Sequence, residues 1–142
     1  MSADKENTYP LPEGSFLAAA GLTLKELVVD GPSSVVRGRL VVDERHHTPW
    51  GVVHGGVWAT AIESAASLGA SAVVEERGQF AVGVDNLTDF LRPVRAGELD
   101  LVARPAQIGR SLHLWEVHIT DADGKAVARG RVRLANQSFP TG

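Results

Sequence analysis

A histidine, two glycines and one carboxylate form the stretch of this chain best suited to chemistry on a carbonyl group. The stretch reads HGGVWATAIE, with His54 before Gly55 and Gly56, and Glu63 eight residues after Gly55. If a helix begins at the glycines, its first N–H groups lack helical partners and carry partial positive charge, which can stabilise an oxyanion. Glycine at both positions lets a substrate approach the backbone closely. Glu63 can activate water or attack the carbonyl itself, and the residues leave both routes open.

The spacing of Gly55 and Glu63 predicts that the two do not serve one site within one chain. Eight residues of helix rise ~12 Å at ~1.5 Å per residue, which is more than a glutamate side chain can bridge. If both act on one carbonyl, they come from two subunits whose central helices run antiparallel across a two-fold axis. Dimerisation is then a condition of activity. The competing interpretation is that the glycines only let the helix pack against a strand.

The neighbours of Glu63 predict its environment. It is flanked in sequence by Ile62 and several alanines, so we expect the carboxylate to be partly desolvated. Desolvation disfavours the charged form and makes a carboxylate a better base near neutral pH. The alternative is a glutamate exposed on a solvated helix face, where Glu is a common helix former.

One long helix and six strands have to position these residues. An alanine-rich run without proline predicts the helix over 55–76, with Gly78 as its stop. A short helix over 14–21, capped by Ser15, precedes the first strand. Alternation and turn signals predict strands over 22–30, 33–43, 79–94, 97–109, 110–120 and 125–136. This order predicts an α+β fold with an antiparallel sheet packed against one helix, and its uncovered edge strands predict a homodimer or larger assembly.

Length and composition limit the class of protein. The 142 residues suit a single domain, which we place at 14–142 after a polar, flexible N-terminal arm at 1–13. The net charge of −3 argues against a general nucleic-acid binder. The chain has no cysteine, and His46, His47 and His54 lack a carboxylate at a recognised ligand spacing, so we expect no metal.

The sequence also bears on the cellular location of the protein. No apolar run reaches the ~20 residues that span a bilayer. The N-terminal stretch MSADKENTYPLPEG is polar and acidic, unlike a signal peptide. We therefore expect a cytoplasmic protein without a membrane partner.

Three motifs together resemble the hotdog-fold acyl-CoA thioesterases. They are WGVVHGG at the helix entry, TDFLRPVRAGELDLVA after the helix and DADGKAVARGRVRL near the end, and the likeness spans roughly residues 22–135. The chain is most similar to the 4-hydroxybenzoyl-CoA thioesterase of the soil-actinobacterial type and to phenylacetate-pathway thioesterases. The resemblance implies one helix wrapped by an antiparallel sheet, and dimers with a continuous sheet that pair into homotetramers. It also implies an acyl-CoA substrate and no cofactor other than the coenzyme A in that substrate.

The resemblance suggests roles for residues near the helix. In the family the residue at His54 more often positions the helix start than acts as a base. Thr48 stands where the family usually has Gln or Asn, so it keeps a hydroxyl but loses an amide that can contact the carbonyl or a water. Ser67 replaces a family threonine four residues after Glu63. Its hydroxyl can bond the carboxylate or the departing thiolate, or it can serve only as a small residue in a tight contact.

The remaining candidates concern binding of the acyl group and the nucleotide. Trp58 can wall the acyl pocket or simply fill the core. Arg110 and Ser111, in a predicted turn between strands, and Arg92, in FLRPV, match family positions that contact the nucleotide of coenzyme A. Phosphates call for Arg and N–H donors, although each arginine can equally be a solvated surface residue.

Two other functions are compatible with the sequence. One is a hotdog hydratase or dehydratase, which uses a histidine together with a carboxylate; here Pro49 rather than a histidine lies fourteen residues before Glu63. The other is a non-catalytic acyl-CoA-binding or assembly module, in which Glu63 would be idle. Hydration of an enoyl-CoA without release of a thiol would favour the first, and normal binding by Glu63→Ala without any lost activity would favour the second.

Overall fold

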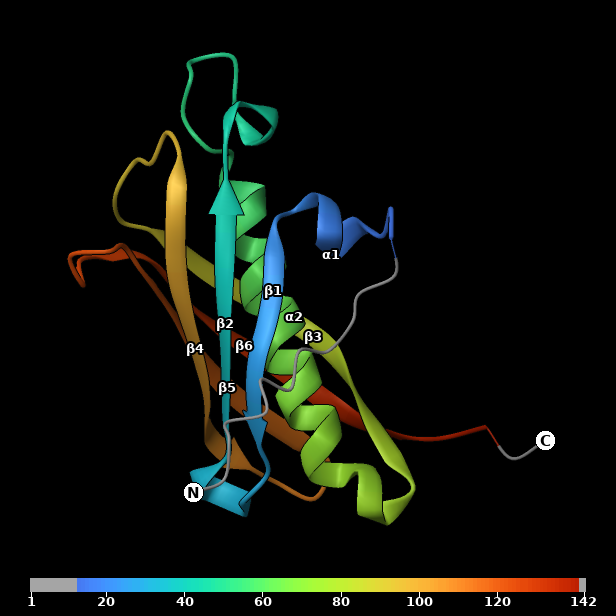
Figure 1. Ribbon diagram of the computed structural model, residues 1–142. Coiled ribbons are helices and arrows are strands. Elements are labelled where there is room, and N and C mark those ends of the chain that lie inside the picture. The colour runs from blue at the N-terminus through green and yellow to red at the C-terminus, as the bar shows by residue number, and fades with distance from the viewer. Residues whose placement is uncertain (1–12, 141–142) are drawn as a thin grey trace, which may run out of the picture.

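The computed structural model describes residues 13–140, and its elements follow the order that the sequence predicts (Figure 1). The helices are α1 (Phe16–Ala19) and α2 (Gly55–Val74), with 3-10 turns η1 (Gly31–Ser33), η2 (Glu44–His46) and η3 (Glu75–Arg77). The strands are β1 (Leu22–Val28), β2 (Val35–Val42), β3 (Gln79–Phe90), β4 (Gly97–Ile108), β5 (Leu112–Thr120) and β6 (Ala126–Ser138). The predicted N-terminal arm at 1–13, except for Glu13, lies outside the described residues.

The six strands form one antiparallel sheet in the order β1-β2-β4-β5-β6-β3. In Figure 1 the sheet curves around α2, with β1 and β3 on either side of the helix. This is the α+β hotdog arrangement that the sequence and the resemblance predict. Within the described residues β1 pairs only with β2, and β3 only with β6, so each leaves one edge free.

Small residues on α2 let the sheet approach the helix closely. Ala61, Ala65 and Ala66 are fully buried. A Cβ added at Gly69 would lie 2.5 Å from the ring of Trp115 in β5, so steric contact requires glycine there. The sheet supplies the large core side chains, among them Leu40, Leu101, Ile119 and Leu134. Burying a side chain of this size contributes roughly 1.5–3 kcal/mol, so the contact between helix and sheet is a large favourable term in folding.

The ends of both helices carry signals that the sequence shows. The Ser15 side chain accepts the N–H of Ala18 and caps α1, as predicted. Gly78 ends the helical region with a φ of 69°, the left-handed conformation that glycine adopts at low cost, which confirms the predicted stop. The predicted helix over 55–76 is longer than α2, because Glu75 and Glu76 belong to the 3-10 turn η3.

The helical stretch from Gly55 to Arg77 is long and apolar enough to cross a membrane by length and composition. In this fold its apolar face packs against the sheet instead, which is the usual situation of a core helix in a globular domain.

Candidate active site

α2 begins at Gly55, and His54 is its N-cap. His54 Nδ1 accepts the N–H of Gly56 at 2.8 Å, so the proton of the neutral ring is on Nε2. The N–H of Gly55 donates to no atom of residues 13–140. The start of the helix therefore offers one free donor at its positive end.

Gly55 and Gly56 also have local reasons to lack a side chain. A Cβ on Gly55 would lie 2.5 Å from the ring of Phe90, the last residue of β3, and a Cβ on Gly56 would lie 2.9 Å from His54 Nδ1. Packing against a strand, the competing interpretation, therefore accounts for Gly55, whereas Gly56 leaves room for the ring of His54. This packing is compatible with a free Gly55 N–H, because the ring of Phe90 lies where a Cβ would be.

His46 holds the segment before α2 in place, and sequence reasoning missed this role. The ring is only 7% exposed. Its Nδ1 accepts the N–H of Asp43 at 3.0 Å, its Nε2 lies 2.8 Å from the carbonyl oxygen of Ala19, and its own carbonyl accepts the N–H of His54 at 2.8 Å. One residue thus joins α1, η2 and the start of α2. The sequence carries one sign of this role: His46 lies three positions after Asp43, which is the spacing of a capping box.

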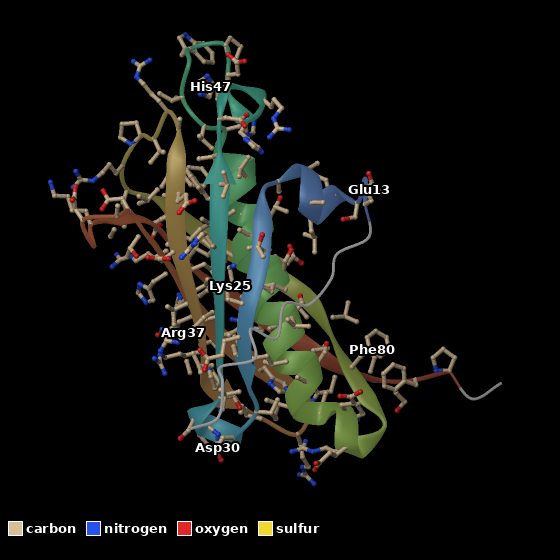
Figure 2. The ribbon with its side chains drawn as sticks, in the orientation of Figure 1. Glu13, Lys25, Asp30, Arg37, His47 and Phe80 are labelled. Atoms are coloured by element: carbon tan, nitrogen blue, oxygen red, sulfur yellow. The ribbon has the colours of Figure 1, made fainter. Side chains whose placement is uncertain are left out.

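Asp43 strengthens the same segment. Its carboxylate accepts the backbone N–H of Arg45 at 2.9 Å and pairs with the Arg45 guanidinium at 2.9 Å. The hydrogen bonds from the side chain and backbone of Arg45 lower the pKa of Asp43 to about 2. Figure 2 shows His47 on the loop that follows, and its Nε2 lies 2.6 Å from the carbonyl oxygen of Arg95, which ties this loop to the connection between β3 and β4.

Thr48 begins a tight turn. Its N–H donates to the carbonyl of Val52 at 2.7 Å, its carbonyl accepts the N–H of Gly51 at 3.1 Å, and its hydroxyl oxygen accepts the N–H of Trp50 at 3.3 Å. Gly51 has a φ of 79°, which favours glycine. Threonine therefore has a conformational role here, and its hydroxyl hydrogen stays available for another acceptor.

Glu63 lies on the flank of α2 that faces β3. Our expectation of partial desolvation is wrong for the single chain, because Glu63 is exposed while its neighbour Ile62 is fully buried. Consecutive helical residues point about 100° apart, so the apolar neighbours face the sheet while Glu63 faces its open edge. Its Oε1 lies against Gly83 of β3. Ser67 makes no side-chain hydrogen bond to Glu63 within the described residues.

Trp58 lies in the core cluster and is 2% exposed. This favours core filling over a wall of an accessible acyl pocket. The exposed aromatic residues beside the helix start are instead Phe90, whose ring lies against Gly55, and Phe16, which lines a cavity together with His54 and Gly56.

The candidate nucleotide-binding residues lie at opposite ends of the sheet. Arg110 and Ser111 line a cavity of about 550 Å³ beside the turn between β4 and β5. The N–H of Arg92 donates to the carbonyl of Val127 at the start of β6, whereas the N–H of Asn136, near the end of β6, donates to the carbonyl of Ser111. Nine residues of strand separate these two contacts, or ~30 Å at ~3.3 Å per residue. One chain therefore does not bring Arg92 and Arg110 together.

Asn136 is a second residue that sequence reasoning missed. Its side-chain Nδ2 donates to the carbonyl of Arg110 at 3.0 Å, in addition to the backbone bond to Ser111. The side chain thereby holds the shape of the turn. Among residues 13–140 no group of three His, Cys, Asp or Glu side chains is arranged to hold a metal ion.

Comparisons with known proteins find relatives along most of the chain. Residues 51–128 match the family model described as the thioesterase superfamily. A Mycobacterium tuberculosis protein that bears an esterase name is 42% identical over 123 residues, covering 85% of each chain. The 1,4-dihydroxy-2-naphthoyl-CoA hydrolase of Listeria monocytogenes is 34% identical over 106 residues, covering 72% of this chain and 85% of the relative.

Solved structures agree with these relatives. The structure of the M. tuberculosis protein matches with a TM-score of 0.81 at 41% identity, covering 89% of this chain and 98% of that one. A thioesterase from Haemophilus influenzae matches with a TM-score of 0.78 at 30% identity, covering 91% of this chain and 87% of that one.

Proposed function

Because the chain belongs to the thioesterase superfamily and is a thioester hydrolase, we propose that it cleaves acyl-CoA to a free acid and coenzyme A. We propose an aryl or medium-size acyl group, including acyl groups of the 4-hydroxybenzoyl type. The Listeria relative supports an aryl group, since by its name it hydrolyses an aromatic acyl-CoA. The proposed enzyme is cytoplasmic and uses no cofactor beyond the coenzyme A of its substrate.

The free N–H of Gly55 is the observation that carries the proposal. It lies at the positive end of α2, and its neighbour Gly56 is already bonded to His54. A thioester oxygen that accepts this N–H becomes polarised, and the same bond strengthens when the oxygen gains negative charge. Removing one such donor typically costs about 10²–10³ in kcat. In this scheme His54 positions the helix start, and the Thr48 hydroxyl contacts the substrate carbonyl or a water.

Glu63 of the partner subunit supplies the second half of the reaction in this scheme. As a general base it takes a proton from water while the water oxygen attacks the carbonyl carbon. The tetrahedral intermediate then collapses, the C–S bond breaks, and the leaving thiolate takes the proton from the protonated Glu63 carboxyl. As a nucleophile the carboxylate would instead attack the carbonyl carbon and expel the thiolate, which gives a mixed anhydride that water hydrolyses. In either case the proposed role of the Ser67 hydroxyl is to bond the carboxylate or to donate to the departing sulfur.

The free edge of β3 supports a site shared by two chains. Val82, Val84, Leu87 and Phe90 are exposed apolar side chains on this strand. Antiparallel pairing of two β3 strands across a two-fold axis would continue the sheet and cover part of this apolar surface. The two α2 helices would then run antiparallel, with Gly55 of one chain facing Glu63 of the other. We propose that two such dimers associate into a tetramer.

The same two-fold symmetry would bring Arg92 of one chain close to Arg110 of the other. In an antiparallel dimer, the end of β3 that precedes Arg92 meets the partner's opposite sheet end, where Arg110 and Ser111 lie. Arg92 of one chain would thus converge with Arg110 and Ser111 of the other on one nucleotide. Arginine pairs well with phosphate because its planar fork of donors matches the phosphate oxygens.

The test is thiol release from a panel of aroyl-CoA and aliphatic acyl-CoA thioesters by wild type and Glu63→Gln. We expect wild type to release thiol and Glu63→Gln to be slower by about 10²–10⁴. Glu76→Gln, which removes one charge from an exposed glutamate in η3, is the matched control and should keep full activity. Equal rates from wild type and Glu63→Gln would refute the mechanism, and hydration of an enoyl-CoA without thiol release would point to a hydratase.

A further inference from the structure

Gly83 stands at an irregularity in the edge strand β3. The pairing of β3 with β6 shifts register between Gly83 and Asp85, so Val84 is an extra residue with no direct partner. Bulges of this kind are frequent next to active sites, where they redirect a side chain or interrupt pairing. Figure 2 marks Phe80 three residues earlier on the same strand.

The backbone of Gly83 does not explain the choice of glycine. Seven glycines of the described chain have positive φ, among them Gly51 and Gly78, and Gly83 is not one of them. Any residue can adopt its conformation. Glycine also weakens a strand because of its unfolded-state entropy and its missing side chain. The reason for glycine is therefore the space beside it.

A carboxylate occupies that space. A Cβ built on Gly83 would overlap Glu63 Oε1 and would lie 3.4 Å from Glu63 Cδ. The corresponding positions at Gly69 and Gly130 are instead taken up largely by core side chains, those of Trp115 and Ile62. Among the described residues, Gly83 is the glycine whose missing side chain makes room for the carboxylate of Glu63.

We propose that Gly83 is a positioning residue for the reaction: its bare Cα lets the Glu63 carboxylate rest against β3. The inference depends on the proposed role of Glu63. Alanine at this position meets the tip of a flexible, exposed side chain rather than backbone, so the carboxylate moves and the fold does not. Displacement of a reacting group by about 1 Å can cost ~10²-fold in rate, so Gly83 acts on the chemical step through Glu63.

The experiment is a double-mutant cycle of Gly83→Ala with Glu63→Asp, measured by steady-state kinetics at enzyme concentrations high enough for slow variants to stay visible. Gly83→Ala should lower kcat by about 10- to 100-fold, with KM, melting temperature and oligomeric mass unchanged. Aspartate is one methylene shorter and does not reach the added Cβ. In the Glu63→Asp background, Gly83→Ala should therefore change the rate less than about twofold. Such non-additivity is expected of two residues in contact, whereas the effects of independent sites add.

A crystal structure of Gly83→Ala gives the second measurement, and we expect the Glu63 carboxylate to have moved away from β3. Unchanged kcat, an equal proportional loss in both backgrounds, an unmoved carboxylate, or a variant that unfolds or dissociates would each overturn the inference. Failure of the proposed function looks different, because Glu63→Gln would then be as active as wild type. An inactive Glu63→Gln beside a fully active Gly83→Ala would remove only the role of Gly83.

Discussion

His54 Nδ1 accepts the N–H of Gly56 at 2.8 Å, and this bond divides the two glycines at the helix start into different roles. The N–H of Gly56 is used within the chain, while that of Gly55 donates to no atom of residues 13–140. The same bond limits what His54 can do. Its Nδ1 is already an acceptor, so that nitrogen is not available to take a proton from water.

The first prediction distinguishes a helix-capping role of His54 from a role as a general base. Loss of a helix N-cap costs about 0.5–2 kcal/mol, and Asn is among the best capping residues. We expect His54→Ala to lower the free energy of unfolding by about 1 kcal/mol in urea denaturation, and His54→Asn to restore most of it. Activity should follow stability, with His54→Asn well above His54→Ala. If His54→Asn is fully stable yet as inactive as His54→Ala, the ring itself takes part in proton transfer.

The second prediction concerns the shared site. Proline is well tolerated at the first helical position and has no N–H, so Gly55→Pro removes the proposed donor. Glu63→Ala removes the carboxylate, and each variant alone should be inactive. A statistical mixture contains half hybrid dimers, each with one intact site of two, so we expect about a quarter of the wild-type activity to return. Thiol release measured before and after mixing checks this.

Differently tagged subunits provide the control for that mixing experiment, since co-purification shows that subunits have exchanged. Because the ring of Phe90 lies against Gly55, the melting temperature of Gly55→Pro has to be compared with that of wild type first. No recovery of activity after proven exchange of folded subunits would contradict a site built by two chains.

The third prediction tests the turn that holds Arg110. We expect Arg110→Ala to raise KM for acyl-CoA by roughly tenfold, because one charge-assisted hydrogen bond contributes about 1.5–3 kcal/mol. The same variant should not change KM for the matching acyl-pantetheine, which lacks the nucleotide phosphates. Arg104→Ala, in which an exposed arginine of β4 outside the cavity is removed, is the matched control. An equal rise in KM for both substrates would place Arg110 outside the nucleotide site.

The fourth prediction is a pH dependence of stability due to His113. This histidine lies on β5 and is buried. Its Nδ1 accepts the indole N–H of Trp115 at 3.3 Å, and its Nε2 has no hydrogen-bond partner among the described residues. Burial lowers its pKa below the usual 6.5; the nearby charge of Arg77 acts in the same direction, while the neighbouring side chain of Asn136 opposes it. Above pH 6.5 the ring is neutral in the folded and unfolded states, so it adds no pH dependence there.

Below pH 6.5 the unfolded chain takes up a proton that the folded chain resists, so the free energy of unfolding falls as pH falls toward the folded pKa. One proton gives a slope of at most about 1.4 kcal/mol per pH unit. His113→Gln keeps hydrogen-bonding groups but does not titrate, so its stability should fall less steeply than that of wild type between pH 7 and pH 5. Urea titrations at each pH measure both slopes. Parallel slopes would show that His113 is protonated equally in both states.

Local sequence signals determined the elements of this protein and their order. The alanine-rich helix, its stop at Gly78, the cap at Ser15 and the alternating strands all depend on residues within a few positions of one another, and the structure confirms them. The single long helix among six antiparallel strands then leaves few ways to bury the apolar residues, which is why the α+β fold could be predicted.

The environment of each site residue was decided only by the tertiary structure. Glu63 is exposed and Trp58 is buried because the rotation of α2 against the sheet sets which residues face the core. His46 joins α1 to α2 through bonds to residues distant in sequence, a partnership that no local pattern encodes. The rise of a helix was enough to show that Gly55 and Glu63 are too far apart for one chain. The contact between the Glu63 carboxylate and Gly83 could not be predicted from the sequence. It joins a helix to an edge strand, and contacts between distant segments depend on how whole elements pack.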